Sequence, residues 1–136
     1  MRWHESVGVI EIMSTGFSGA ESAGIRIGDI VAVFAQGPIS LCATAGAKLS
    51  GASVVIGVDR LPNRLQMAGK MGADHVIDSS KLDPVEEIMR LTGGRGVDVA
   101  IEALVRGTYR SAAGQRRCSR ERRLQGQFTT ARPAYN

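Results

Sequence analysis

Residues 31–59 read VAVFAQGPISLCATAGAKLSGASVVIGVD. An apolar run leads into a Gly-Pro turn, a segment rich in small residues follows, and a second apolar run ends in an acid. This order is typical of a β-α-β unit whose first turn holds the phosphates of a dinucleotide. Such turns usually carry three glycines, whereas here the three positions are Ala35, Gly37 and Ser40. The turn by itself is therefore a weak signal.

Strand and helix signals alternate on both sides of this stretch. We expect strands at residues 29–34, 53–58, 75–77 and 97–101, and helices at 39–50, 62–71 and 84–91. Asp83 is the predicted N-cap of the last helix, with a proline directly after it. The pattern predicts an α/β fold with a partial doubly wound parallel sheet of four strands in spatial order 3-2-1-4. On the pattern alone, a dehydrogenase, a methyltransferase and a flavodoxin-like module are all open.

The fourth strand of this predicted sheet has no further strand beside it. We therefore expect it to be an exposed edge. Unpaired backbone groups at such an edge favour pairing with a second copy of the chain, so self-association is expected.

Charge is unevenly distributed over the 136 residues, although the net charge is +4. Residues 1–104 contain nine basic and twelve acidic residues, whereas residues 105–136 contain eight arginines and one acid, Glu121. Tyr109, Phe128 and Tyr135 lie among these arginines. Arginines pair with phosphates and aromatic rings stack on bases, so a non-enzymatic nucleic-acid-binding module is the alternative function. We favour a solvated tail without nucleic acid as a partner.

The sequence gives no sign of a membrane or of secretion. No apolar run approaches the roughly 18 residues of a membrane span, and the first residues lack the apolar core of a secretory signal. Cys42 and Cys118 are far apart and have no metal-binding spacing. We expect a cytoplasmic protein with no membrane partner.

Asp59 strengthens the prediction of a nucleotide site. It closes the second predicted strand, 22 residues after Gly37, and an acid about 20 residues after the turn accepts hydrogen bonds from the adenosine ribose. A carboxylate there also repels a 2′-phosphate, which favours NAD over NADP. Arg60 and Arg64 keep NADP possible, because either could accept a phosphate. Alternatively, Asp59 only ends a strand.

Four motifs in this order resemble one family. They are MSTGFSGAE at residues 13–21, GDIVAVFAQGPISLCATAGAKL at 28–49, MGADHVID at 71–78 and DPVEEIMRLTGGRGVDVAIEAL at 83–104. The chain resembles the zinc-dependent alcohol dehydrogenases of the medium-chain dehydrogenase/reductase family, in particular their secondary-alcohol branch. The resemblance implies a Rossmann domain that takes part in hydride transfer between a secondary alcohol or ketone and a nicotinamide dinucleotide.

The resemblance also implies roles for individual residues, but no catalytic residue. Zinc in this family needs further ligands from an N-terminal catalytic domain that we do not find here, so we expect the isolated fragment to be inactive. By position, the resemblance implies Gly37, Pro38 and Ile39 at the pyrophosphate, Asp59 at the adenosine ribose, Thr15 on the nicotinamide side, and Glu11 as a zinc ligand. Arg60, beside Asp59, is a further candidate cofactor-binding residue.

The family pattern stops at Leu104, and Val105 takes the place of an expected glycine. We expect three parts: a connecting segment at residues 1–27, a truncated dinucleotide-binding domain at 28–104 and an arginine-rich tail at 105–136. The tail is interpreted as disordered or foreign to the family. An arginine-rich stretch without lysine suggests a truncated or frameshifted reading frame, which resequencing the locus would test.

Overall fold

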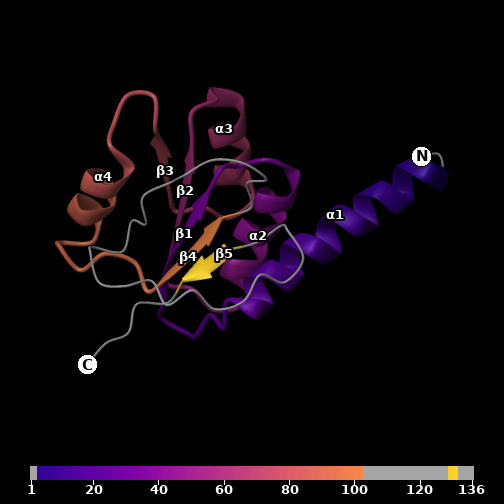
Figure 1. The fold of residues 1–136 in the computed structure, drawn as a ribbon, viewed down its shortest axis with the longest axis horizontal. Helices are drawn as coiled ribbons and strands as arrows, with labels where there is room; N and C mark the ends of the chain where they lie inside the picture. Colours follow the sequence, from indigo (N-terminus) through magenta and orange to yellow (C-terminus); the bar gives the residue numbers. More distant parts are fainter. Residues whose placement is uncertain (1–2, 103–128, 132–136) are drawn as a thin grey trace.

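The computed structural model describes residues 3–102 and 129–131, which form one sheet with helices packed against it (Figure 1). None of the helices in this part of the chain has the length and apolar content of a membrane span. The helices are α1 (Trp3–Ser22), α2 (Pro38–Leu49), α3 (Pro62–Lys70) and α4 (Pro84–Leu91). The strands are β1 (Ile30–Phe34), β2 (Val54–Asp59), β3 (His75–Asp78), β4 (Val99–Glu102) and β5 (Thr129–Ala131).

The first four strands are parallel and lie in the order β3-β2-β1-β4, as the sequence predicts. Both faces of the sheet are covered, because side chains alternate along β1. Val31 and Val33 pack with residues of α2, and Ala32 and Phe34 pack on the other face with Ile88 of α4. The fold is therefore a doubly wound α/β sheet, which brings the carboxyl ends of β1 and β2 side by side.

The prediction that β4 is an exposed edge is wrong. β5 pairs with it in antiparallel direction, with Ala131 opposite Ala100 and Thr129 opposite Glu102. The edge of a strand offers unpaired N–H and C=O groups. The three residues of β5 pair with some of these groups on β4. The short run Thr-Thr-Ala has too little apolar pattern to reveal a strand. The rest of the arginine-rich tail, with its three aromatic residues, lies outside the described residues.

The predicted connecting segment contains a long helix, α1. Its C-terminal half lies beside α2, while its N-terminal half projects away from the sheet (Figure 1). Gly16 and Ala20 are buried in the half that meets α2. Val9 and Ile10, in the projecting half, and Met13, at the middle of the helix, are each more than half exposed. Among the described side chains of α1, the buried ones thus lie in its second half, which packs against α2.

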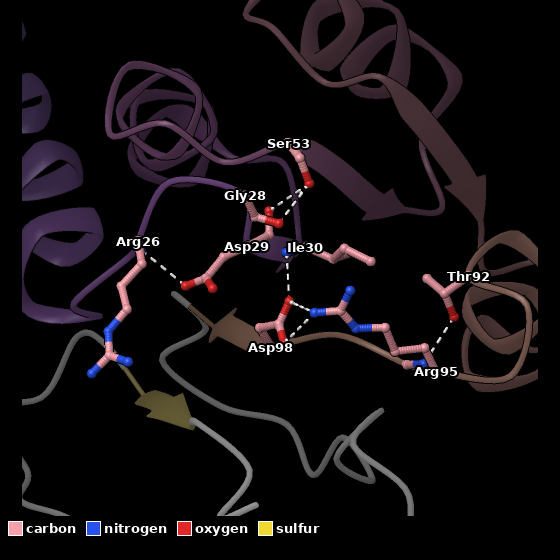
Figure 2. Close-up of polar contacts among 9 residues, drawn as sticks. Arg26, Gly28, Asp29, Ile30, Ser53, Thr92, Arg95 and Asp98 are labelled. Carbon is pink, nitrogen blue, oxygen red and sulfur yellow. Dashed lines mark hydrogen bonds and ion pairs between the residues drawn. The ribbon is translucent and has the colours of Figure 1, made fainter.

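Acids that precede strands fix the amino end of the sheet. The N–H of Asp98 donates to Ile30 O at 2.8 Å, and the N–H of Ile30 donates back to Asp98 Oδ2 at 2.8 Å (Figure 2). Arg95 donates to both carboxylate oxygens of Asp98 at 3.1 Å. Asp74 and Val55 make the same reciprocal pair, with both distances 2.8 Å. Each pair fixes the register of neighbouring strands where they begin.

Asp98→Ala should lower the free energy of unfolding by about 1–3 kcal/mol, because the N–H of Ile30 loses its acceptor on a side chain that is only 7% exposed. Asp74→Ala should cost less, because its side chain is 35% exposed and water can replace it. Asp98→Asn keeps an acceptor oxygen and should recover part of the loss. Urea unfolding of the three variants checks this order; a larger loss for Asp74→Ala than for Asp98→Ala would contradict it.

Candidate functional site

The candidate site lies at the carboxyl ends of β1 and β2, where α2 begins. Gly37 is the N-cap of α2, Pro38 is its first residue, and no side chain caps this helix start. Pro38 has no N–H, so the first-turn donors are those of Ile39 and Ser40. The backbone N–H groups at a helix start, together with the helix dipole, favour a bound anion. The turn therefore has the chemistry of a phosphate site.

Gly37 is not required by the conformation of its own backbone. Its φ of −73° and ψ of 176° are open to any residue. A Cβ built at this position meets no atom of the described residues within 4 Å. The space beside Gly37 is therefore open, and the fold gives no reason for a glycine there. Close approach of a ligand to the backbone does give one.

Among the residues that the structure describes, Ala35 is the one non-glycine residue with a left-handed backbone conformation; its φ is 59°. The sequence leaves its φ open, and the structure gives it the positive value that favours glycine. Alanine therefore introduces strain at the first position of the turn. Ser40, at the third position, is 2% exposed, so its hydroxymethyl group is accommodated within the packing of α2.

Ala35→Gly should stabilise the chain by about 0.5–1 kcal/mol, since relief of left-handed strain outweighs the larger unfolded-state entropy of glycine. Urea unfolding measures the change. Ala32→Gly in β1 is the matched control, because this buried residue does not have a positive φ, and glycine there should destabilise. Loss of stability in Ala35→Gly would show that the turn holds alanine without strain.

Gln36, which the sequence does not single out, connects the parts of the site. It is fully buried; its Nε2 donates to Val33 O at 2.8 Å, and its Oε1 accepts from Thr44 Oγ1 at 3.0 Å. Its backbone N–H donates to Asp59 Oδ2 at 2.6 Å. The absence of a side chain at Gly57 leaves room for it, because a Cβ there would lie 3.3 Å from Gln36 Cδ. A polar residue inside an apolar turn, followed by a threonine on the next helix, is the only sequence signal of this network.

Asp59 ends β2 and is 7% exposed. Besides Gln36, the N–H groups of Arg60 and Leu61 donate to its Oδ1 at 2.6 and 3.0 Å, and Arg64 lies 3.7 Å from Oδ2. Burial alone would raise the pKa of this carboxyl, but the three backbone N–H bonds and the Arg64 guanidinium together hold the pKa below its usual value. Asp59 is therefore a carboxylate at neutral pH, and it also fixes the turn.

The two arginines predicted beside Asp59 are placed differently. The side chain of Arg60 is exposed, and it is the backbone N–H of this residue that contacts the carboxylate. Arg64, on α3, forms the ion pair with Asp59. Of the predicted pyrophosphate residues, Pro38 is exposed and Ile39 is half-buried. The structure thus brings five residues together at the carboxyl ends of β1 and β2: Gly37, Pro38, Ile39, Asp59 and Arg64.

Glu11 lies on an exposed face of α1. Its backbone carbonyl accepts hydrogen bonds from Ser14 Oγ at 3.1 Å and Thr15 Oγ1 at 2.8 Å. In the part of the chain that the structure describes, no group of three or more His, Cys, Asp or Glu side chains could hold a metal ion. Zinc takes at least three protein ligands, so the described residues do not fit a zinc site, and Glu11 as a ligand stays a prediction.

Comparisons with known proteins agree with this arrangement. The family model described as zinc-binding dehydrogenase matches residues 38–117. The alcohol dehydrogenase of Cupriavidus necator is 65% identical over 94 residues, covering 69% of this chain and 26% of that protein. The NADP-dependent isopropanol dehydrogenase of Thermoanaerobacter brockii is 46% identical, covering 72% of this chain and 28% of that protein. The solved alcohol dehydrogenase TADH from Thermus sp. ATN1 has a TM-score of 0.65 and 36% identity, covering 68% of this chain and 27% of that one.

A parallel sheet in this order, with an uncapped helix start beside a strand-ending acid, defines a Rossmann-like domain. The family model covers more than half of the chain, which therefore belongs to the zinc-binding dehydrogenase family. The chain spans about a quarter of the length of the relatives it matches. The family match ends at residue 117, beyond Leu104, where the sequence pattern led us to expect it to stop. The division into three parts at residues 1–27, 28–104 and 105–136 stays a prediction.

Proposed function

We propose that this chain binds a nicotinamide dinucleotide at the carboxyl ends of β1 and β2, with NAD favoured over NADP. The observation that carries the proposal is Gly37, where a side chain would meet only open space beside the uncapped start of α2. A pyrophosphate that lies against this backbone accounts for a glycine that the fold does not require.

In this proposal, Asp59 recognises the adenosine ribose. Three of the roughly four lone-pair positions of its carboxylate already accept backbone N–H bonds. The remaining capacity can accept a ribose hydroxyl, and the negative charge repels a 2′-phosphate. Arg64 offsets part of this repulsion from 3.7 Å away, so the expected preference for NAD is modest.

The experiment that tests the proposal is a calorimetric titration of the full chain with NAD and NADP. We expect weak binding of both, tighter for NAD. The titration is repeated on a chain without residues 105–136, which should bind NAD with similar affinity because the proposed contacts lie between residues 37 and 64. Absence of binding by both forms would overturn the proposal.

The family relation further suggests hydride transfer between a secondary alcohol or ketone and the nicotinamide. The dinucleotide supplies the hydride acceptor when it is bound. Gly37 and the start of α2 hold its phosphates, and Asp59 orients its ribose. Because the described residues do not form a zinc site, this domain contributes cofactor binding and orientation only.

Incubation of the purified chain with NAD, zinc and secondary alcohols should therefore give no measurable NADH. Absorbance of NADH measures turnover, and Glu11→Ala is assayed alongside. Turnover that survives repurification and is lost in Glu11→Ala would contradict the expected inactivity, and would place a working zinc ligand on α1.

A further inference from the structure

Gly16, on α1, touches the helix that begins at the proposed phosphate site. A Cβ at this position would lie 2.6 Å from Ile39 O, 3.1 Å from Ala43 N and 2.4 Å from Cys42 Cβ. Ile39 O and Ala43 N are backbone atoms of the first turns of α2. The backbone of α1 therefore rests directly on the backbone of α2, at a residue whose own N–H is one of the two proposed phosphate donors.

These contacts leave little freedom for a larger residue. Cβ atoms essentially never approach other heavy atoms within 3.0 Å, and two of the three neighbours belong to the helix backbone, which cannot turn aside as a long side chain can. Alanine at position 16 must push the two helices apart or tilt the start of α2. Because Gly37, Ile39 and Ser40 form that start, the displacement moves the N–H groups that face the ligand.

A second glycine contact between the same helices lies further from the site. A Cβ at Gly46 would lie 2.9 Å from Ala20 Cβ and 3.3 Å from Phe17 Cδ1. These two nearest neighbours are side-chain atoms, and the nearest backbone atom, Phe17 Cα, is at 3.6 Å, an ordinary contact distance. Gly46 is near the C-terminal end of α2. The two glycines thus meet the first turns and the last turn of α2, and the contact of Gly16 is the one beside the proposed phosphate site.

We propose that Gly16 is a positioning residue for the dinucleotide: it lets α1 support the first turns of α2, and so fixes the N–H groups of Ile39 and Ser40 where the pyrophosphate binds. The inference rests on the proposed function. The contact between Gly16 and α2 also connects the rest of α1 to the proposed site. Thr15 is next to Gly16, and its hydroxyl donates to the carbonyl of Glu11, so the contact holds both residues in position relative to α2.

The test compares Gly16→Ala with Gly46→Ala in the full chain, by thermal melting and by NMR titration with NAD. In the parent, NAD should shift the backbone amide resonances of Ile39 and Ser40. Gly16→Ala should weaken NAD binding about tenfold or more and reduce both shifts, because small misplacements of binding groups cost affinity steeply. Gly46→Ala should change the melting temperature but keep NAD affinity within about twofold of the parent.

If Gly16→Ala fails to fold, Cys42→Val is used instead. It enlarges the side chain on α2 that faces Gly16 by branching it at Cβ, and is expected to weaken NAD binding about threefold. NAD affinity within about twofold of the parent in the folded Gly16 variant overturns the inference, as does an equal loss in both glycine variants. A parent chain that binds neither NAD nor NADP overturns the proposed function itself. That outcome is distinct, because the amide resonances then stay unshifted in all of the proteins.

Discussion

Asp59→Ala is expected to lower the free energy of unfolding by about 3 kcal/mol and to narrow the preference between NAD and NADP. The substitution removes the acceptor of three backbone N–H groups, one of which belongs to the fully buried Gln36. It also removes the carboxylate that is placed to repel a 2′-phosphate in the proposed site, and leaves the Arg64 guanidinium without its ion pair to that carboxylate and able to attract a phosphate. The loss of stability and the change in cofactor preference thus have one origin.

Two control variants separate these effects. Asp78 pairs in register with Asp59 at the end of β3, but its carboxylate contacts Ser80 and Lys81 rather than the turn. Asp78→Ala makes the same change in charge one strand away, and should leave the NAD to NADP ratio unchanged. Asp59→Asn keeps an acceptor oxygen and should retain more stability than alanine while losing the discrimination. An Asp59→Ala protein that discriminates as well as the parent would show that this acid does not contact the ribose.

Acidic pH should lower the folding stability of the chain through the Asp59 carboxylate. The pKa of Asp59 is lower in the folded chain than its ordinary value, because backbone N–H bonds and Arg64 outweigh the effect of burial. A lowered folded-state pKa contributes stability above the unfolded-state pKa, and that stability is lost as the pH falls through the folded value. Asp74 shifts in the same direction, where Lys48 and the N–H of Val55 outweigh burial. Unfolding midpoints from neutral to acidic pH should therefore decrease less in Asp59→Asn than in the parent.

Gly37→Ala is expected to cause the largest loss of NAD affinity and only a small loss of folding stability. The backbone of Gly37 suits alanine, and among residues 3–102 and 129–131 the new methyl group meets no atom within 4 Å. The loss of N-cap preference should therefore cost at most about 1 kcal/mol. The same methyl group would occupy the space that we assign to the pyrophosphate. NAD affinity should fall by about ten- to a hundredfold.

Gly69→Ala is the matched control for this variant. A Cβ at Gly69 also meets no atom within 4 Å, but the residue lies near the C-terminal end of α3, at the opposite end of the sheet from the turn. The control should bind NAD like the parent, and should be slightly more stable because alanine favours helix over glycine. Calorimetry and urea unfolding of both variants provide the comparison. Unchanged NAD affinity in Gly37→Ala would mean that the open space is not the phosphate site.

Sequence signals identified the frame of the site because local chemistry determines it. Apolar runs predicted the four parallel strands, and Asp83 caps α4 by accepting from the N–H groups of Val85 and Glu86, as expected. The spacing from Gly37 to Asp59 indicated that the turn and the acid belong to one site, and in the structure both lie at the carboxyl ends of β1 and β2. These features depend on the turn, the cap and the alternation of strands and helices, which residues close together in the sequence determine.

Other features depend on contacts between distant segments. The left-handed φ of Ala35 follows from the course of the whole turn, and alanine gives no sign of it. The Gln36 network needs Thr44, Asp59 and Gly57 to meet, and β5 needs an edge to pair with. The support of α2 by Gly16 arises only after α1 packs. Such contacts are set by tertiary structure rather than by local propensity.

The bond between Ile30 and Asp98 has a consequence for how the chain is made. It joins residues 68 positions apart, and β4 is the strand that covers one side of β1. During synthesis, β1, β2 and β3 leave the ribosome before β4 does. The nascent chain therefore carries an uncovered apolar strand edge until residues 98–102 emerge, which is the interval in which a chaperone has most to protect.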